Sequence, residues 1–217
     1  MNSEEIDLSQ WVCQDGPEND IVLSSRIRLA RNIKNFPYPN IASEAELKEL
    51  LSQTKTVLNT REKVNLNYIN MSKLSHRERE LFVERNLSSP ALIEGGAYKG
   101  LFLNSEENIS IMINEEDHLR IQVLLPGLEL NKAWEKADYI DDLLESKLDF
   151  AFSRKWGYLS ACPTNLGTGL RASVMVHLPA LNIMDRIEKM LNAVSQLGLV
   201  VRGLYGEGSR SNGNIYQ

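Results

Sequence analysis

The sequence lacks any long hydrophobic run. Within its 217 residues no stretch of about 18 apolar residues occurs, so no transmembrane helix is expected. The chain begins MNSEEIDLSQW, which has acidic residues where a secretory signal peptide would carry positive charge and an apolar core. Cysteine is scarce as well: Cys13 and Cys162 lie far apart and show no metal-ligand spacing. These absences predict a cytoplasmic protein with reduced thiols.

Positive charge is not in excess. The chain has 29 acidic and 24 basic residues, which gives a formal net charge of -5. A general nucleic-acid binder needs a surplus of lysine and arginine to release counterions from the phosphate backbone, so that class of protein is disfavoured. The hydrophobic content of 42% is ordinary for a globular protein and allows a substantial core.

No repeat, low-complexity tract or Gly/Ser linker divides the chain. A polar segment, residues 1–20, precedes one domain that we assign to residues 21–217. Its expected strands form pairs joined by short turns, whereas its expected helices are long single pieces. This alternation predicts an α+β fold with a largely antiparallel sheet flanked by helices. We expect strands over residues 21–29, 64–71, 97–103, 109–113, 119–125, 170–178 and 199–204, and helices over 43–59, 75–85, 130–153 and 179–197.

Two of the helices begin with a recognisable capping signal. Ser43 is followed three residues later by Glu46, and Ser75 by Glu78. In this spacing each side chain bonds the backbone N–H of the other residue, which satisfies donors that a helix start leaves free.

The segment NEEDHLRIQ, residues 114–122, concentrates ionisable groups beside a strand. A period of two places Glu116, His118, Arg120 and Gln122 on one face and the apolar residues on the other. The flanking residues are too apolar for a rim, so we interpret this face as a site. The alternative is a ladder of surface salt bridges.

A second polar segment, SSRIR, contains Arg26 and Arg28 on an expected buried strand. Two residues apart, both guanidinium groups emerge on one face. Buried arginines require partners, and two together suggest a polyanion such as a triphosphate. Arg31 is either a third member of this group or a surface residue.

The segment CPTNLGTGLRASVMVHLP, residues 162–179, joins a cysteine, a glycine loop and a strand that carries Arg171. The strand places Arg171, Ser173, Met175 and His177 on one face. The loop lacks the ending of a P-loop and the pattern of a dinucleotide-binding fingerprint. Phosphate here must be held by arginine side chains more than by a helix N-terminus.

The segment RGLYGEG, residues 202–208, ends the last expected strand in a glutamate between glycines. Such a residue is commonly a turn residue. Paired with Glu116, Glu207 could instead bracket a cationic substrate.

Taken together, SSRIRLARN, NEEDHLR, CPTNLGTGLRASV and RGLYGEG resemble the phosphagen (guanidino) kinases in order and spacing, and most closely the bacterial kinases that act on protein arginine. The resemblance covers residues 21–217. It implies a glutamine-synthetase-like catalytic domain that transfers the γ-phosphoryl group of ATP, with magnesium, to a guanidinium nitrogen of arginine side chains in proteins.

The resemblance also implies roles for individual residues. Glu116 would be the catalytic carboxylate, Glu207 a second carboxylate on the guanidinium, and Cys162 a thiolate that orients it without covalent attack. The nucleotide contacts would be Ser24, Ser25, Arg26, Ile27, Arg28, Arg120, Arg171, Ala172, Ser173, Val174, Met175, Arg202, Gly203, Leu204, Tyr205, Gly206 and Glu207.

Implied partners are arginine-bearing protein substrates, a stress-gene repressor, a zinc-finger activator, a Clp-type protease system and a second copy in a homodimer. The sequence departs from the family at Asn86, which replaces a usual nucleotide-contacting histidine. It also stops at Gln217, inside what would be the family's catalytic domain.

Three alternatives remain beside protein-arginine phosphorylation. A kinase of a free guanidino metabolite, such as arginine or creatine, would use the same site. A cysteine hydrolase acting on arginine would use Cys162 with His118 or His177, without ATP, and would leave the arginine pairs unexplained. A non-catalytic adaptor would bind nucleotide or arginine only.

Overall fold

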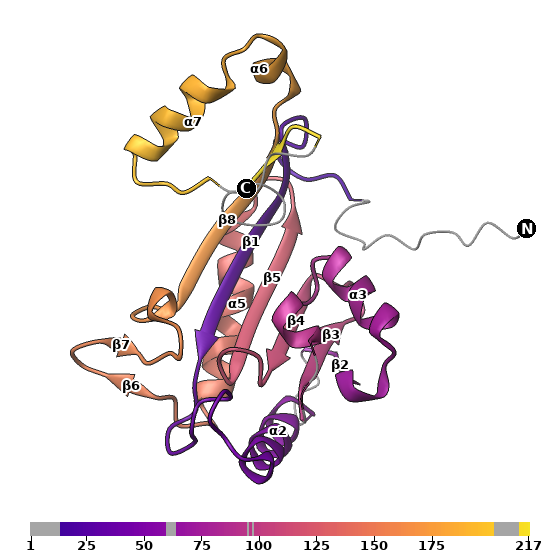
Figure 1. The fold of residues 1–217 in the computed structure, drawn as a ribbon, viewed down its shortest axis with the longest axis vertical. Helices are drawn as coiled ribbons and strands as arrows, with labels where there is room; N and C mark the ends of the chain where they lie inside the picture. The colour runs from indigo at the N-terminus through magenta and orange to yellow at the C-terminus, as the bar shows by residue number, and fades with distance from the viewer. Residues whose placement is uncertain (1–13, 60–63, 95, 97, 202–212) are drawn as a thin grey trace, which may run out of the picture.

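A computed structural model describes residues 14–59, 64–94, 96, 98–201 and 213–217. In this part of the chain the main element is a seven-stranded sheet in the order β2-β3-β4-β5-β1-β8-β9, with every neighbouring pair antiparallel (Figure 1). The largely antiparallel α+β prediction is therefore confirmed. The strands are β1 (Val22–Arg31), β2 (Leu66–Asn70), β3 (Gly100–Asn104), β4 (Ile109–Ile113), β5 (Leu119–Pro126), β8 (Leu170–His177) and β9 (Ile215–Tyr216).

One face of the sheet packs against helices α2 (Glu44–Asn59) and α5 (Leu130–Glu145). Helix α5 lies behind β1 and β5 in Figure 1 and faces them with small and branched residues at helical spacing. Burying this stripe against alternate strand residues makes the main core. From the helices it includes Leu50, Leu58, Ala133, Ala137, Ile140 and Leu144, and from the central strands Ile27, Leu29, Ile111, Ile121 and Val123.

Among the described residues, helices cover the other face at its β2–β4 end. There the short helices α3 (His76–Glu84) and α4 (Pro90–Ile93) and the 3-10 turn η1 (Met71–Lys73) pack on the strands, and α3 lies in front of them in Figure 1. The small second core joins Met71, Leu87, Leu92, Ile93, Leu101, Leu103 and Met112. None of its members comes from β1, β5 or β8, so this core does not extend over the polar side chains of those strands.

Both capping boxes form as predicted. The Ser75 side chain accepts from the Glu78 N–H while the Glu78 carboxylate accepts from the Ser75 N–H, and Ser43 and Glu46 repeat the exchange. The expected hairpin of β3 and β4 is also confirmed, with its turn at residues 105–108.

Two expected helices are wrong in length. The helix expected over 130–153 ends at Glu145, after which Leu148 and Phe150 turn into the core and a short ribbon follows, β6 (Phe152–Ser153) and β7 (Gly157–Tyr158). The helix expected over 179–197 is split into α6 (Pro179–Ile183) and α7 (Ile187–Gln196) by Asp185, whose φ is +53°. Of the strand expected over 199–204, residues 199–201 are not extended into a strand, and the rest lies outside the described residues.

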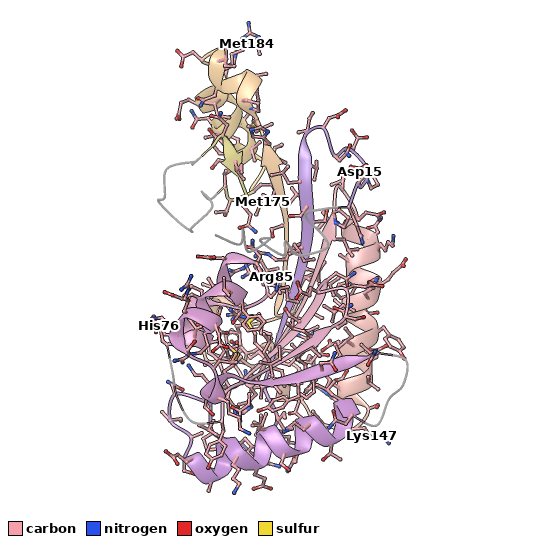
Figure 2. All side chains as sticks on the ribbon, turned by 90° about the vertical axis from the view of Figure 1, so that its right-hand side faces the viewer. Asp15, His76, Arg85, Lys147, Met175 and Met184 are labelled. Atoms are coloured by element: carbon pink, nitrogen blue, oxygen red, sulfur yellow. The ribbon has the colours of Figure 1, made fainter. Side chains whose placement is uncertain are left out.

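Helices α6 and α7 lie at one end of the molecule, far from α2 (Figure 1), and Met184 between them marks that end in Figure 2. Ile187 is the one buried residue of the two helices. Among the described residues, no helix has both the length and the apolar character needed to cross a bilayer.

Candidate functional site

Four arginines from three neighbouring strands lie on the same face of the sheet as α3 and α4, beyond the β2–β4 end. In the strand register Arg28 of β1 stands opposite Arg171 of β8, and Arg26 opposite Ser173. On the other side Ala30, on the same face as Arg28, stands opposite Arg120 of β5. Because directly opposed residues in an antiparallel pair project to one side, these guanidinium groups share a face. We call Arg26, Arg28, Arg120 and Arg171 the arginine platform.

The platform cations repel one another. Burial, followed by the charges of Arg171 and Arg120, lowers the pKa of Arg26 to about 10. Burial and the charges of Arg26, Arg120 and Arg171 lower the pKa of Arg28 to about 9, with Glu115 opposing the shift. The Nε of Arg26 is buried and has no hydrogen-bond partner. A bound polyanion would reduce the repulsion between these cations and would accept a hydrogen bond from the unpaired Nε of Arg26.

Arg120 forms ion pairs with the carboxylates of two consecutive residues, Glu115 and Glu116. Its Nη1 donates to Oε1 of Glu115 at 2.8 Å and its Nη2 to Oε2 of Glu116 at 3.2 Å. The Glu115 side chain is 2% exposed and also accepts from the Ser89 hydroxyl at 2.5 Å, whereas the Glu116 side chain is 39% exposed. The buried carboxylate of Glu115 therefore fixes the position of the Arg120 guanidinium group. Glu116 remains accessible at the edge of the platform.

The sequence reasoning missed Glu115. Strand β5 starts only at Leu119, so the period of two cannot be extended back to the acids that precede it. The signal available was the doubled glutamate itself, which gives one arginine two carboxylate partners. Oε2 of Glu115 is buried without a hydrogen-bond partner, which leaves a free acceptor near the platform.

His118 is not part of this face, so its predicted alignment with Glu116 and Arg120 is wrong. Its Nδ1 accepts from the Ile33 N–H at 2.9 Å, and its Nε2 donates to the Pro37 carbonyl at 2.8 Å. Burial lowers the pKa of this imidazole. His118 is thus a neutral, fully bonded structural residue.

Arg31 is neither a platform member nor a surface residue. It is 3% exposed and donates to Oδ2 of Asp141 on α5 from Nη2 at 2.6 Å and from Nε at 3.1 Å. Its guanidinium also lies 3.7 Å above the ring of Tyr158 and bonds the Thr168 carbonyl. It joins β1, α5 and the loop before β8.

Cys162 begins the 3-10 turn η2 (Pro163–Asn165) on the loop that leads into β8. Its Sγ lies 3.1 Å from Oγ1 of Thr164, and the residue is half-buried. Its backbone N–H donates to the hydroxyl of Ser160 at 3.1 Å, and that hydroxyl donates in turn to Asp117. Asp117 directly follows Glu116 in the chain, so the loop that carries the sulfur is bonded beside the accessible carboxylate.

The other predicted nucleotide contacts divide by face. Ser24, Ser173 and Met175 share the platform side of their strands. The hydroxyl of Ser25 donates to the Gly127 carbonyl, and Ile27 belongs to the main core. Together with Ala172 and Val174, the side chains of these two residues project to the face opposite the platform. The predicted contacts and catalytic acid at Arg202, Gly203, Leu204, Tyr205, Gly206 and Glu207 lie outside the described residues.

Asn86, predicted to replace a histidine, follows α3 with φ +58°. Its carbonyl accepts from Nε2 of Gln122, a β5 residue opposite Arg28, at 2.7 Å. This hydrogen bond connects the segment between α3 and α4 to strand β5 through the backbone carbonyl of Asn86.

No group of three or more His, Cys, Asp or Glu with metal-binding geometry occurs among the described residues. The accessible carboxylate of Glu116 and the unpartnered Oε2 of Glu115 are oxygen ligands of the type that hard divalent cations prefer.

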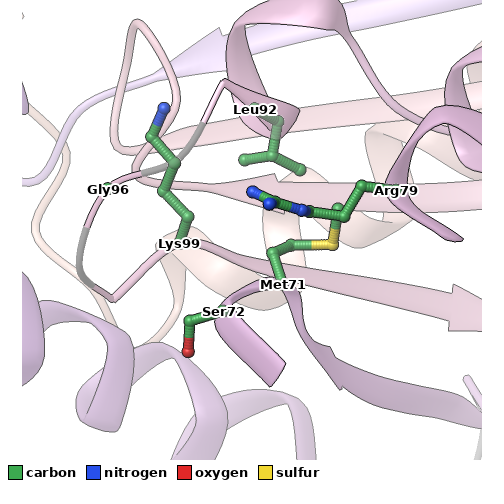
Figure 3. Close-up of a pocket in the computed structure, with 6 residues that line it drawn as sticks. All are labelled: Met71, Ser72, Arg79, Leu92, Gly96 and Lys99. Carbon is green, nitrogen blue, oxygen red and sulfur yellow. The ribbon is translucent and has the colours of Figure 1, made fainter. Parts of the chain in front are cut away.

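A separate pocket lies under α3 and α4 (Figure 3). Two cations border it, but Arg79 donates to the Ile93 carbonyl and Lys99 to the Ala91 carbonyl at the end of α4. These cations satisfy the free carbonyls of a helix end. The pocket contains no platform residue; it is lined by Met71, Ser72, Arg79, Leu92, Gly96 and Lys99.

Known proteins are similar to this chain in sequence. The family model of the ATP:guanido phosphotransferase C-terminal catalytic domain matches residues 49–217. A protein-arginine kinase of Halothermothrix orenii is 61% identical over 97% of this chain and 60% of its own length. A protein-arginine kinase of Desulforamulus reducens is 48% identical over 96% of this chain and 60% of its own. The chain thus spans about 60% of the length of these curated relatives.

Solved structures share the fold. A taurocyamine kinase of Schistosoma mansoni, solved with components of a transition-state analogue, superposes with a TM-score of 0.80 at 24% identity, covering 93% of this chain and 29% of that one. Lombricine kinase superposes with a TM-score of 0.77 at 25% identity, covering 96% of this chain and 62% of that one.

Proposed function

The chain belongs to the ATP:guanido phosphotransferase family, and we propose that it carries a site for ATP-dependent phosphorylation of arginine side chains in proteins. The observation that carries this proposal is the arginine platform beside Glu116. A surface of this kind suits phosphoryl transfer, in which catalysis is mostly positioning and neutralisation of charge on the transferring oxygens.

The platform is the donor half of the proposed site. Arg26, Arg28 and Arg171 would hold the polyphosphate of ATP, and Arg120 would be kept in position by its two glutamates. Bound magnesium would supply further neutralisation of the phosphate oxygens, with Glu116 and Glu115 as the nearby carboxylates. Because the guanidinium fork is planar and pre-organised, less side-chain entropy is lost for each hydrogen bond formed to phosphate.

Glu116 and Cys162 are the acceptor half. An arginine guanidinium has a pKa above about 12 and is a poor nucleophile. The Glu116 carboxylate would align it by a bidentate contact and accept the proton that leaves as the N–P bond forms. The sulfur of Cys162 would orient the cation from the loop, without forming a covalent bond to it. Glu207 would add a second carboxylate.

Protein arginine is the preferred acceptor because the curated relatives carry the name protein-arginine kinase. A free guanidino metabolite is the second candidate, since taurocyamine kinase and lombricine kinase have the same fold. A stress-gene repressor, a zinc-finger activator, a Clp-type protease system, a homodimer and a cytoplasmic location belong to the same proposal.

The test incubates the full 217-residue chain with magnesium, γ-labelled ATP and either an arginine-rich protein or free arginine, and quantifies acid-labile phosphoarginine. Label should appear on the protein. Glu116→Gln should reduce the rate by about 10² to 10⁴, the usual contribution of a general base. Lys34→Gln is the control, because that exposed side chain pairs only with Asp149 at the surface. Its rate should match that of the unaltered chain.

The other outcomes separate the alternatives. Label on free arginine alone would overturn the protein-kinase assignment in favour of a metabolite kinase. Nucleotide binding by calorimetry, weakened in Arg28→Gln but without any transfer, would support an adaptor. An ATP-independent thiouronium adduct on Cys162 would favour the hydrolase.

A further inference from the structure

Asp117 is a buried carboxylate that the proposed reaction does not use. It is 1% exposed, and no described lysine or arginine forms an ion pair with it. Its two oxygens instead accept from neutral donors on two separate parts of the chain. An isolated buried anion is costly unless hydrogen bonds replace its hydration, so this set of donors is what keeps the charge inside the protein.

The donors come from strand β1 and from the Cys162 loop. Asn32, directly after β1, donates its amide Nδ2 to Oδ1 at 2.7 Å. From the loop, the Ser160 hydroxyl lies 2.8 Å from Oδ2, the Ala161 N–H donates to Oδ1 at 2.9 Å, and Asn165 Nδ2 donates to Oδ2 at 3.0 Å. Asp117 therefore fastens both ends of the 160–165 turn to the β4–β5 turn and to the end of β1.

One of these bonds leads directly to the sulfur-bearing residue. The hydroxyl that Ser160 donates to Asp117 also accepts the backbone N–H of Cys162 at 3.1 Å. Because Asp117 follows Glu116 without an intervening residue, the same carboxylate fixes the loop relative to the accessible acid. We propose that Asp117 is a positioning residue that sets Cys162 against Glu116 through Ser160, and so builds the acceptor half of the proposed site.

The proposal rests on the proposed function for its catalytic meaning, but its structural content can be tested without kinase activity. The first measurement is the rate of Cys162 alkylation by iodoacetamide at fixed pH in the full chain, followed by peptide mass spectrometry to separate Cys162 from Cys13. Asp117→Asn replaces one of the two accepting oxygens with an NH2 group, which then faces donors instead of accepting from them. Its Cys162 should be alkylated about five-fold faster or more, the effect of losing at least one ordinary hydrogen bond.

The variant Ser160→Ala separates the anchoring of the Cys162 loop from the charge of Asp117. It leaves the Asp117 carboxylate in place and removes only the hydroxyl between that carboxylate and the Cys162 N–H. Its alkylation rate should rise by a similar factor, and the double variant should be no faster than the faster single variant, because both changes break one connection. Additive effects in the double variant would overturn the relay through Ser160.

A matched control separates positioning from general loss of stability. Leu50→Ala opens the main core at α2, where Leu50 is 1% exposed. It should lower the unfolding midpoint at least as much as Asp117→Asn and leave Cys162 alkylation within about two-fold of the unaltered rate. An equal acceleration in Leu50→Ala, or an unchanged rate in both Asp117→Asn and Ser160→Ala, would overturn the proposal. If Asp117→Asn does not fold, the comparison of Cys162 alkylation rates in Ser160→Ala and Leu50→Ala tests the proposal.

The second measurement applies where phosphoryl transfer is observed. Ser160→Ala should raise the KM for the arginine acceptor by about five-fold while the KM for ATP stays within about two-fold, because the platform arginines stand on β1, β5 and β8 and not in the 160–165 turn. A rise confined to the ATP KM would contradict the assignment to the acceptor half. A chain without kinase activity would refute the proposed function and leave the alkylation result to judge Asp117 alone.

Discussion

His118 shows how a single residue can have a pH-dependent effect on stability. Burial lowers its folded-state pKa below the ordinary 6.5. Between the folded and unfolded pKa values the unfolded chain binds the extra proton, so stability falls as the pH drops through and below about 6.5. We expect the free energy of unfolding in urea to decrease less between pH 8 and pH 5.5 in His118→Gln than in the unaltered chain.

His76→Gln is the comparison for this experiment, because the His76 side chain is 70% exposed. It should keep the full pH dependence. A His118→Gln profile parallel to that of the unaltered chain would show that His118 does not titrate differently on folding.

The Arg31–Asp141 pair offers a second test at the scale of residues. Burial is the main cause of the raised pKa of Asp141, and the hydrogen bonds from Arg31 oppose it. Arg31→Met removes the ion-pair partner of this carboxylate and should lower the free energy of unfolding in urea by about 3–5 kcal/mol. Arg31→Met combined with Asp141→Leu should recover most of that loss. An equal loss in the single and double variants would show that the pair's charges are not the cause.

Sequence patterns identified the ionisable residues of the site more reliably than they predicted the side of the sheet on which each residue lies. Arg26, Arg28 and Arg171 were placed correctly because they stand within regular strands, where the period of two applies. His118 and Glu115 precede β5, and their directions depend on bonds to residues such as Ile33 and Ser89. Those partners are tens of residues away in sequence, so no local pattern contains them.

At the scale of elements, the loop into β8 depends on two glycines in the left-handed region. Gly169 has φ +62°, and a Cβ there would lie 2.6 Å from the Ala30 carbonyl. Gly167 has φ +107° with open space around it. Gly169→Ala therefore adds a backbone clash to the strain that both substitutions share, and should destabilise the fold by about 1–3 kcal/mol more than Gly167→Ala.

Thermal and urea unfolding of the two variants measure this difference. Because β8 starts at Leu170 and carries Arg171, Gly169→Ala should also weaken nucleotide binding more than Gly167→Ala does. Equal losses at both positions would mean that β8 adjusts freely to the added methyl group.

Element boundaries followed the sequence where a local signal exists. The capping boxes at Ser43 and Ser75 fix two helix starts through contacts three residues apart. The end of α5 has no such signal, because Leu148 and Phe150 continue an apolar pattern while packing outside the helix. The interruption between α6 and α7 at Asp185 likewise lacks a glycine or proline that would predict it from the sequence.

At the scale of the whole molecule, the sheet is covered unevenly. Among the described elements, helices α2 and α5 cover one face, and α3 and α4 cover the β2–β4 end of the other. The platform lies on the remaining half, so four cations gather in a chain whose formal net charge is -5. A local basic surface within an acidic protein suits a small polyanion better than a long nucleic acid.

The same uneven cover predicts how the molecule opens. Strands β4 and β5 are buried almost throughout, whereas α7 has one buried residue, Ile187, and Leu197, Leu199 and Val200 after it are 79%, 60% and 67% exposed. Regions with few buried apolar contacts open at low free energy, while core strands exchange their amide hydrogens only on global unfolding.

Hydrogen exchange followed by mass spectrometry should therefore find the amides of α6 and α7 exchanging faster than those of α2 and α5, and those of β4 and β5 exchanging slowest. Added magnesium–ATP should slow exchange at the start of β8, where Arg171 stands, and leave α7 unchanged. Protection of α7 equal to that of α5, which packs on β1 and β5, would show that α7 is covered in solution by contacts that this arrangement of the chain does not provide.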